Sequence, residues 1–217
     1  MTTDTGVRRA GRAAPMPPDE RRRAIVDAVV PLLLEHGRAV TTKQIAEGAG
    51  IAEGTIFRVF ESKDELVDAA LTSAFDPAPF LADLSRIDRE QPLEARLVQV
   101  VTILQRRFMG IFALMRAVGM VAPPEHLGAG DAADNWRARV REILVAVIEP
   151  DAHRLRVAPH QLLHTLRLLT FSASHAEIAD NELMTPQEIV DVVLHGMLAR
   201  ADPPTVDREP THPKGED

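Results

Sequence analysis

The sequence of 217 residues contains no cysteine, so it can form neither a disulfide nor a thiolate metal site. No continuous apolar run approaches the roughly 20 residues that a membrane-spanning helix needs, and we therefore expect no such helix. The arginines near the N-terminus have no apolar stretch behind them, which argues against a signal peptide. Because hydrophobic residues still make up 45% of the chain, a packed globular protein of the cytoplasm is the simplest interpretation.

Sequence signatures of helical enzymes are missing as well. We find no Glu-x-x-His pair for a di-iron centre, no cysteine nucleophile and no glycine-rich phosphate loop. His160 and His164 have a spacing that suits a metal, but no third ligand is evident. We therefore expect no catalysis, metal or cofactor, and keep a helical-bundle enzyme acting on a hydrophobic substrate only as an alternative.

Charge is distributed unevenly along the chain, whose net charge is −7. Residues 1–63 carry a net charge of +2, whereas residues 64–217 carry −9. The positive charge of the first part concentrates at Arg8, Arg9, Arg12, Arg21, Arg22 and Arg23. A basic end on an acidic body can still bind DNA, because attraction to phosphate acts locally at physiological salt.

The spacing of apolar residues predicts an all-α fold, since no segment of useful length alternates with the period of a strand. Residues 1–18 lack periodicity and are expected to form a flexible arm. A first helix is expected from Asp19, and Gly37 supplies its C-terminal stop. Pro31 interrupts the helical pattern and weakens this assignment.

Two short elements follow the first helix. Thr41 with Gln44 fits a capping box that begins a helix of about eight residues, which ends near Gly50. A second helical pattern covers 52–60, and Ser62, with a Glu three residues later, fits another capping box. Two short helices joined by a tight turn after a longer helix indicate a helix-turn-helix unit, whose second helix can enter the major groove.

The remainder is helical in pattern. Pro77 and Pro79 are expected to break the chain, and Pro92 to open a long helix. The composition of 122–131 predicts a loop. Further helices are expected at about 132–149, 159–179 and 186–200.

The stretch TTKQIAEGAGIAEGTIFRVFESKDEL resembles the signature of the TetR (tetracycline repressor) family of transcriptional regulators. The resemblance covers about residues 20–70, and the rest agrees only in length and helical pattern. It implies an N-terminal three-helix DNA-binding domain and a larger C-terminal helical domain. The expected parts are a basic arm (1–18), a helix-turn-helix domain (19–65), a ligand-binding and dimerisation domain (66–201) and a disordered tail (202–217).

The resemblance also implies which residues contact DNA. Thr42 and Lys43 begin the first short helix, where a hydroxyl, a cation and free N–H groups can hold phosphate. Gly54 permits close approach to DNA, and Arg58 is the best candidate for a bidentate contact to guanine. The expected DNA-binding residues are Arg21, Thr42, Lys43, Glu53, Gly54, Thr55, Phe57, Arg58 and Lys63.

Three residues depart from the family's pattern. Phe57 replaces the usual Tyr and lacks its hydroxyl, and Ala52 replaces a capping Ser, a loss of about 1 kcal/mol of helix stability. Glu53 repels phosphate unless it accepts a hydrogen bond from a cytosine amine. These departures leave the operator sequence open.

Apolar and aromatic side chains of the larger domain could line an adaptable pocket. Each of them could equally be an ordinary core residue, and the sequence leaves both interpretations open. The candidates are Phe80, Phe108, Phe112, Met115, Trp136, Phe171 and His175.

The helices expected at 159–179 and 186–200 have apolar residues on more than one side. They could simply be core, but the resemblance implies a four-helix interface with a second copy, which reading a palindromic operator also requires. We therefore expect a homodimeric repressor that is released from its operator by a small, largely apolar effector. A DNA-binding regulator without an effector is the alternative, because an apolar core and an apolar pocket have the same sequence pattern.

Overall fold

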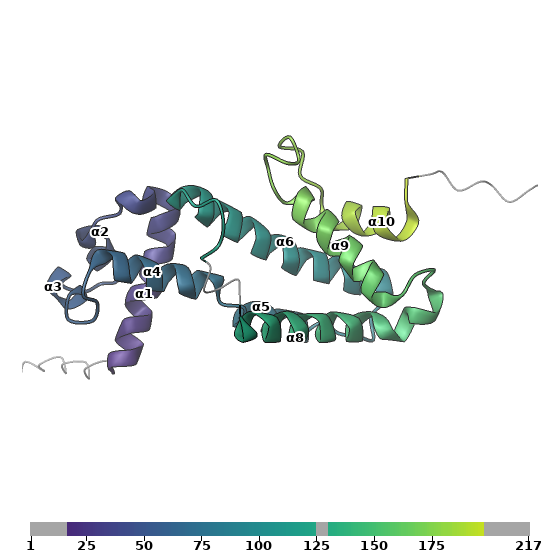
Figure 1. Cartoon of the computed structure of the whole chain (residues 1–217), viewed down its shortest axis with the longest axis horizontal. Coiled ribbons are helices and arrows are strands. Elements are labelled where there is room, and N and C mark those ends of the chain that lie inside the picture. Colours follow the sequence, from purple (N-terminus) through teal and green to yellow (C-terminus); the bar gives the residue numbers. More distant parts are fainter. Residues whose placement is uncertain (1–16, 125–129, 198–217) are drawn as a thin grey trace, which may run out of the picture.

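The computed structural model describes residues 17–124 and 130–197, and every regular element in these ranges is helical (Figure 1), which confirms the all-α prediction. The predicted tail, nearly all of the predicted arm and the end of the helix expected at 186–200 lie outside these ranges. The elements are α1 (Pro18–His36), η1 (Gly37–Ala39), α2 (Thr42–Gly48), α3 (Glu53–Ile56), α4 (Lys63–Phe75), α5 (Ala78–Ser85), α6 (Leu93–Val118), α8 (Asp131–Ile148), η2 (Glu149–Arg154), α9 (Pro159–Ala173) and α10 (Pro186–His195).

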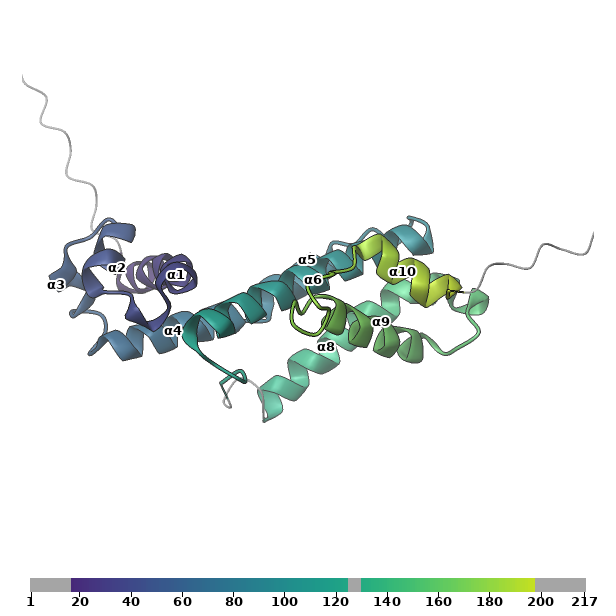
Figure 2. The ribbon, with the colours of Figure 1, turned by 90° about the horizontal axis from the view of Figure 1, so that it is seen from above.

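The molecule is elongated, with α1–α4 at one end and α5–α10 towards the other (Figure 2). We call residues 17–75 the head and residues 76–197 the body. Each has its own cluster of buried apolar side chains. The predicted domain boundary between residues 65 and 66 falls inside α4, whose buried side chains pack in the head core as far as Phe75.

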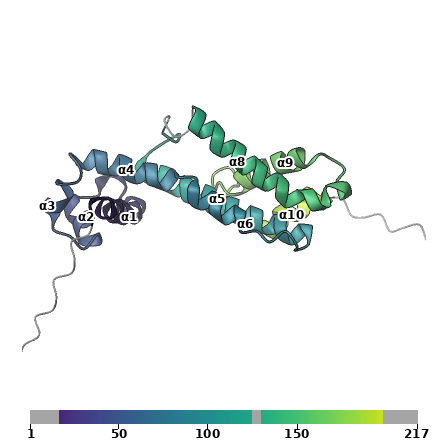
Figure 3. The same ribbon diagram turned by 90° about the horizontal axis from the view of Figure 1, so that it is seen from below.

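Helix α6 joins the two parts, because its first half packs in the body core and its last turns pack in the head core. Leu97 and Leu104 are buried in the body, whereas Leu114 and Val118 are buried in the head core, where α6 packs against α1. At 26 residues, or about 39 Å, α6 runs along the long axis beside α5 (Figure 3). By length and composition alone α6 could cross a membrane, contrary to our expectation, although a core helix of a soluble protein meets the same criterion.

The body core contains a buried cation. The side chain of Arg96 on α6 is 1% exposed, and its Nη1 donates to the carbonyl oxygen of Val147 at 2.5 Å. Arg96 also forms an ion pair with Asp151, which accepts a second hydrogen bond from Arg154 at 2.6 Å. That bond and the charges of Arg154 and Arg96 outweigh desolvation and hold the pKa of Asp151 below its ordinary value.

The structure corrects several local predictions. Helix α1 runs through Pro31 without a break, and Pro31 lies on its exposed side. The chain forms α5 where we expected a break, because Pro79 sits in the first turn of the helix, where its missing N–H costs nothing. Helix α9 ends at Ala173 and not near residue 179, and turns with positive φ at Asp180 and Asn181 follow.

Candidate nucleic-acid interface

The turn between α2 and α3 is built by backbone geometry. Thr41 and Gln44 form the predicted capping box, in which the backbone amide of Gln44 donates to the Thr41 hydroxyl at 3.2 Å. At the other end of α2, Gly50 has a φ of 64°, and the amide of Ile51 donates back to the carbonyl of Ala46 at 3.0 Å. This is a Schellman-type helix end, which glycine accommodates without a Cβ penalty. The chain therefore reverses after two turns of helix, and α3 begins at Glu53.

The predicted element at 52–60 is a helix only at Glu53–Ile56, followed by a turn. Ile56 and Phe60 are buried in the head core and anchor this segment. Around them lies an exposed surface, on which Phe57 is 53% exposed. Glu53, Gly54, Phe57 and Arg58 are exposed, and Thr55 is half-buried. Figure 1 shows α3 at the outermost end of the head, away from the body.

Gly54 has no packing role within the described part of the chain. A Cβ added at this position would meet none of the heavy atoms of neighbouring side chains or backbone within 4 Å. The fold therefore does not require glycine here.

Thr42 and Glu53, which we predicted as separate contacts, are partners in the structure. The Thr42 hydroxyl donates a hydrogen bond to the Glu53 carboxylate. This bond holds the carboxylate beside the N-terminus of α2, where the partial positive charge of the helix end favours an anion. Lys43 is exposed next to this pair. The negative charge that we expected to repel phosphate is thereby partly offset.

Lys63 has a structural role besides its predicted phosphate contact. Its ammonium group donates to the carbonyl oxygens of Arg38 at 3.0 Å and Val40 at 3.1 Å. It therefore ties the start of α4 to the loop before α2. One of its three N–H donors remains for an anion.

The arginines at the start of α1 differ in their surroundings. The guanidinium of Arg22 lies 4.2 Å from the Phe60 ring centre and donates to the Val59 carbonyl at 3.2 Å and to Glu65 at 3.3 Å. Arg22 therefore connects α1 to the segment that follows α3. Arg21, the predicted DNA contact, is half-buried. Glu65 accepts from the amide of Glu61, so Ser62 caps α4 without completing the predicted box.

The predicted ligand-binding residues do not share one site. Phe108, Phe112, Phe171 and His175 form one cluster, with ring centres 4.6–6.2 Å apart. Met115 packs against the head core. The rings of Phe80 and Trp136 lie elsewhere, with their centres 5.0 Å and 5.9 Å from one guanidinium.

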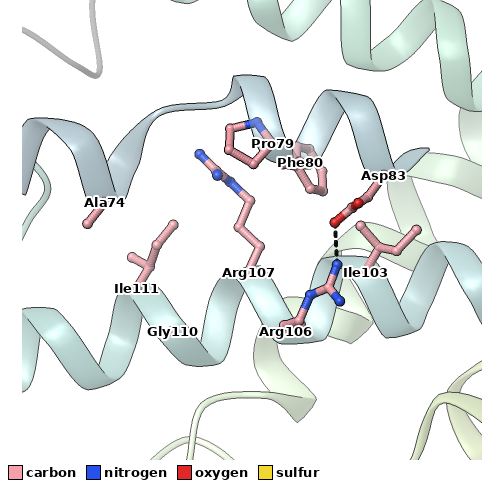
Figure 4. Close-up of a pocket in the computed structure, with 9 residues that line it drawn as sticks. All are labelled: Ala74, Pro79, Phe80, Asp83, Ile103, Arg106, Arg107, Gly110 and Ile111. Atoms are coloured by element: carbon pink, nitrogen blue, oxygen red, sulfur yellow. Dashed lines mark hydrogen bonds and ion pairs between the residues drawn. The ribbon is translucent and has the colours of Figure 1, made fainter. Parts of the chain in front are cut away.

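That guanidinium belongs to Arg107, which sequence reasoning missed. The side chain lines a pocket of about 230 Å³ between α4, α5 and α6 (Figure 4), in which Phe80 is the one predicted ligand-binding residue. At the rim, Arg106 pairs with Asp83. Two adjacent arginines in the middle of a largely apolar stretch of α6 were the signal that could have pointed here.

Comparison with known proteins agrees with this geometry. The model of the family "Bacterial regulatory proteins, tetR family" matches residues 25–70. The transcriptional regulator YvkB of Bacillus subtilis is 50% identical over 58 residues, and the transcriptional repressor KstR2 of Mycobacterium tuberculosis is 37% identical over 59 residues. These alignments cover 26% and 27% of this chain and 30% of each relative, so the chain spans less than a third of the length of the curated relatives it matches.

Solved structures extend the similarity to the whole fold. The fatty acid degradation regulator FadR of Bacillus halodurans has a TM-score of 0.56 at 14% identity, over 83% of this chain and 97% of that one. FadR of Bacillus subtilis, solved with stearoyl-CoA, has a TM-score of 0.54 at 13% identity, over 81% and 99%. The family model falls on the helix-turn-helix unit, and the fold of such regulators covers both head and body. Residues 25–70 of the chain therefore match the DNA-binding part of the tetR family of bacterial regulatory proteins.

Proposed function

We propose that this protein is a homodimeric, cytoplasmic transcriptional repressor that a small, largely apolar effector releases from a palindromic operator. The observation that carries the proposal is the surface of α3. This four-residue helix is anchored by Ile56 and lies within the segment that matches the family model. The helix and the turn after it leave Glu53, Gly54, Phe57 and Arg58 exposed.

The exposed groups of the head have the chemistry of DNA recognition. Arg58 reads a base edge in the major groove, because its planar fork matches the O6 and N7 atoms of guanine. Lys43, exposed in the first turn of α2, holds a phosphate, and Thr55 reaches a base or phosphate with its hydroxyl. Gly54 lets the backbone of α3 approach the groove.

Dimerisation through α9 and α10 is supported by the apolar side chains that these helices expose. Leu168 on α9 is 47% exposed, Phe171 is 38% exposed, and Met197 after α10 is 83% exposed. A second copy would cover them in a four-helix interface. Two heads related by two-fold symmetry then read half-sites about 34–36 Å apart.

Release requires that the effector bind better to a state in which the heads are wrongly spaced. Helices α4 and α6 are suited to transmit that change, because both pack in the head core and both line the pocket. An apolar effector is also supported by FadR of Bacillus subtilis, a protein of the same fold whose structure holds stearoyl-CoA.

The test is selection of bound sequences from a random duplex pool, followed by fluorescence anisotropy at several salt concentrations. We expect a pseudo-palindrome whose affinity falls steeply as salt rises, because binding to phosphates releases counterions. Arg58→Ala should relax the preference at one base pair in each half-site, whereas Lys43→Ala should weaken binding to all sequences alike. A pool that shows no enrichment would overturn the proposal.

A further inference from the structure

We propose that the pocket between α4, α5 and α6 binds the carboxylate of a small apolar or aromatic acid, and that Arg107 is the residue that holds this carboxylate. The inference rests on the proposed function, since it names the class of effector. It also makes Arg107 the link by which the effector acts on the head.

Arg107 is a cation whose hydrogen-bond partners are neutral. Its Nη1 donates to the carbonyl oxygen of Asp76 at 3.1 Å, and its Nη2 to that of Phe75 at 3.0 Å. The guanidinium also lies 5.0 Å from the ring centre of Phe80 and 5.9 Å from that of Trp136. These contacts use two of its five N–H groups and leave donors for a ligand.

The charge of Arg107 is only partly compensated. Burial lowers the pKa of the Arg107 guanidinium, and the negative charge of Asp76 opposes this effect. The Asp76 carboxylate itself accepts from the backbone amide of Ala78 at 3.0 Å. A ligand carboxylate would accept hydrogen bonds from a charged donor, and such bonds are about twice as strong as those to neutral groups.

Apart from the ion pair between Arg106 and Asp83, the remaining lining of the pocket fits a small apolar body. Ala74, Phe80, Ile103 and Ile111 contribute apolar surface (Figure 4), and the volume is about 230 Å³. An apolar cavity of about 150 Å³ is large enough for benzene. A single-ring acid or a short-chain acid therefore matches the pocket in size.

A carboxylate can first engage the free N–H groups of Arg107, and its stronger charge-assisted bonds would then compete with the two carbonyls that Arg107 now holds. Those carbonyls belong to the last residue of α4 and the residue after it, so Arg107 secures the C-terminal end of the helix that leads into the head. A carboxylate that draws the guanidinium away would free this end of α4. The effector thus changes the contact between body and head at the point where it binds.

The experiment uses benzoate, phenylacetate and 3-phenylpropionate, each compared with its neutral amide. Binding is followed by calorimetry and by the fluorescence of Trp136, the single tryptophan of the chain. We expect saturable binding of at least one acid, with its amide about tenfold weaker. Arg107→Met should bind acid and amide alike, whereas Arg116→Met, which removes an exposed cation elsewhere on α6, should keep the preference.

A second variant guards against loss of structure in Arg107→Met. Gly110 lines the pocket, and a Cβ there would meet no heavy atom of the described residues within 4 Å. Gly110→Leu therefore fills the pocket and leaves the contacts of Arg107 in place. It should lose acid and amide binding together while its circular dichroism and unfolding midpoint stay at or above those of the wild type.

The proposal is overturned if acid and amide bind alike to the wild type, if the preference survives in Arg107→Met, or if no acid binds at millimolar concentration. An operator selected without ligand, together with absent acid binding, would leave the proposed function standing and remove this site. Arg107-dependent acid binding without any selected operator would leave this site standing and remove the proposed function. With both present, the bound acid should lower operator affinity, as should Arg107→Met alone.

Discussion

The head and the body of this protein are built by different means. In the head, single polar side chains fix the path of the backbone. Thr41 and Ser62 cap helices, Gly50 turns the chain, and Lys63 and Arg22 hold loop carbonyls. In the body, α6, α8, α9 and α10 pack mainly through apolar side chains.

This difference accounts for the pattern of similarity to other proteins. The family model matches residues 25–70, whereas solved structures share the fold over more than four-fifths of the chain at 13–14% identity. A cap or a left-handed turn requires particular residue types, but an apolar core accepts many combinations of similar volume. The head is therefore recognisable by sequence, and the body only by its shape.

The largest effect is expected at Arg96, a buried polar side chain in a body that packs mainly through apolar ones. Arg96→Ala removes the donor that satisfies the Val147 carbonyl and breaks the buried ion pair, so the free energy of unfolding should fall by about 3–5 kcal/mol. Denaturant unfolding monitored by circular dichroism measures it. The control is Arg86→Ala, because that side chain is 77% exposed and its ion pair should contribute less than about 1 kcal/mol. Equal effects would show that the body has no specific polar anchor.

The second effect concerns the joint between head and body. Gly37 has a φ of 58° and a ψ of −146°, a region that is essentially restricted to glycine, and a Cβ there would clash with the carbonyl oxygen of Ala117 on α6. Gly37→Ala should therefore lower the free energy of unfolding by about 1–3 kcal/mol. Gly48→Ala, in the helical α2, should be neutral or stabilising by up to about 1 kcal/mol. Chemical denaturation measures the free energy of unfolding of both variants. An unchanged value for Gly37→Ala would mean that the backbone around Gly37 and Ala117 shifts to accept the methyl group.

Local signals in the sequence predicted the elements well wherever hydrogen bonds are made between neighbours in the chain. The box at Thr41, the cap at Ser62 and the long helix after Pro92 are all confirmed. The error at α5 arose because Pro79 was interpreted as a break, although a proline in the first turn is compatible with a helix.

Contacts between distant parts of the chain could not be predicted from the sequence. The predicted ligand-binding residues are separated because spacing along a helix does not say which neighbour its face meets. Arg107 escaped notice because its partners are main-chain carbonyls 31 and 32 residues away, and a carbonyl carries no side-chain signature. For the same reason Lys63 was predicted only as a DNA contact, and Arg22 only as part of the basic N-terminal end.

A third prediction separates fold from function in the head. Gly54→Ala adds a methyl group into open space, so stability should be unchanged or rise by up to about 1 kcal/mol. If DNA approaches α3 closely, affinity for the selected operator should fall about tenfold, or about 1.4 kcal/mol. Anisotropy titration and thermal unfolding measure the two quantities. Ser85→Ala, an exposed change in the body, should alter neither, and an unchanged operator affinity in Gly54→Ala would mean that α3 does not approach DNA at this residue.

The smallest effect is a dependence on pH that belongs to the body. The pKa values of Asp151 and Glu188 are both lowered, in Asp151 by the hydrogen bond from Arg154 first and in Glu188 by the bonds from the Thr185 amide and hydroxyl. A lowered pKa means that folding favours the ionised carboxylate. The resulting stability is present above the ordinary value, 3.8 for the aspartate, and is lost as pH falls through the lower value of the folded state.

Arg154→Met tests the aspartate alone, because it removes the largest cause of the shift and leaves Arg96 in place. The pKa of Asp151 should then lie nearer to 3.8, so the body should lose stability at a higher pH than in the wild type. Trp136 fluorescence during acid titration reports on the body, and circular dichroism reports on both parts. Arg139→Met, at an exposed ion pair on α8, is the matched control and should leave the acid transition where it is. If Arg154→Met also leaves it there, the hydrogen bond from Arg154 to Asp151 does not set the acid sensitivity of the body.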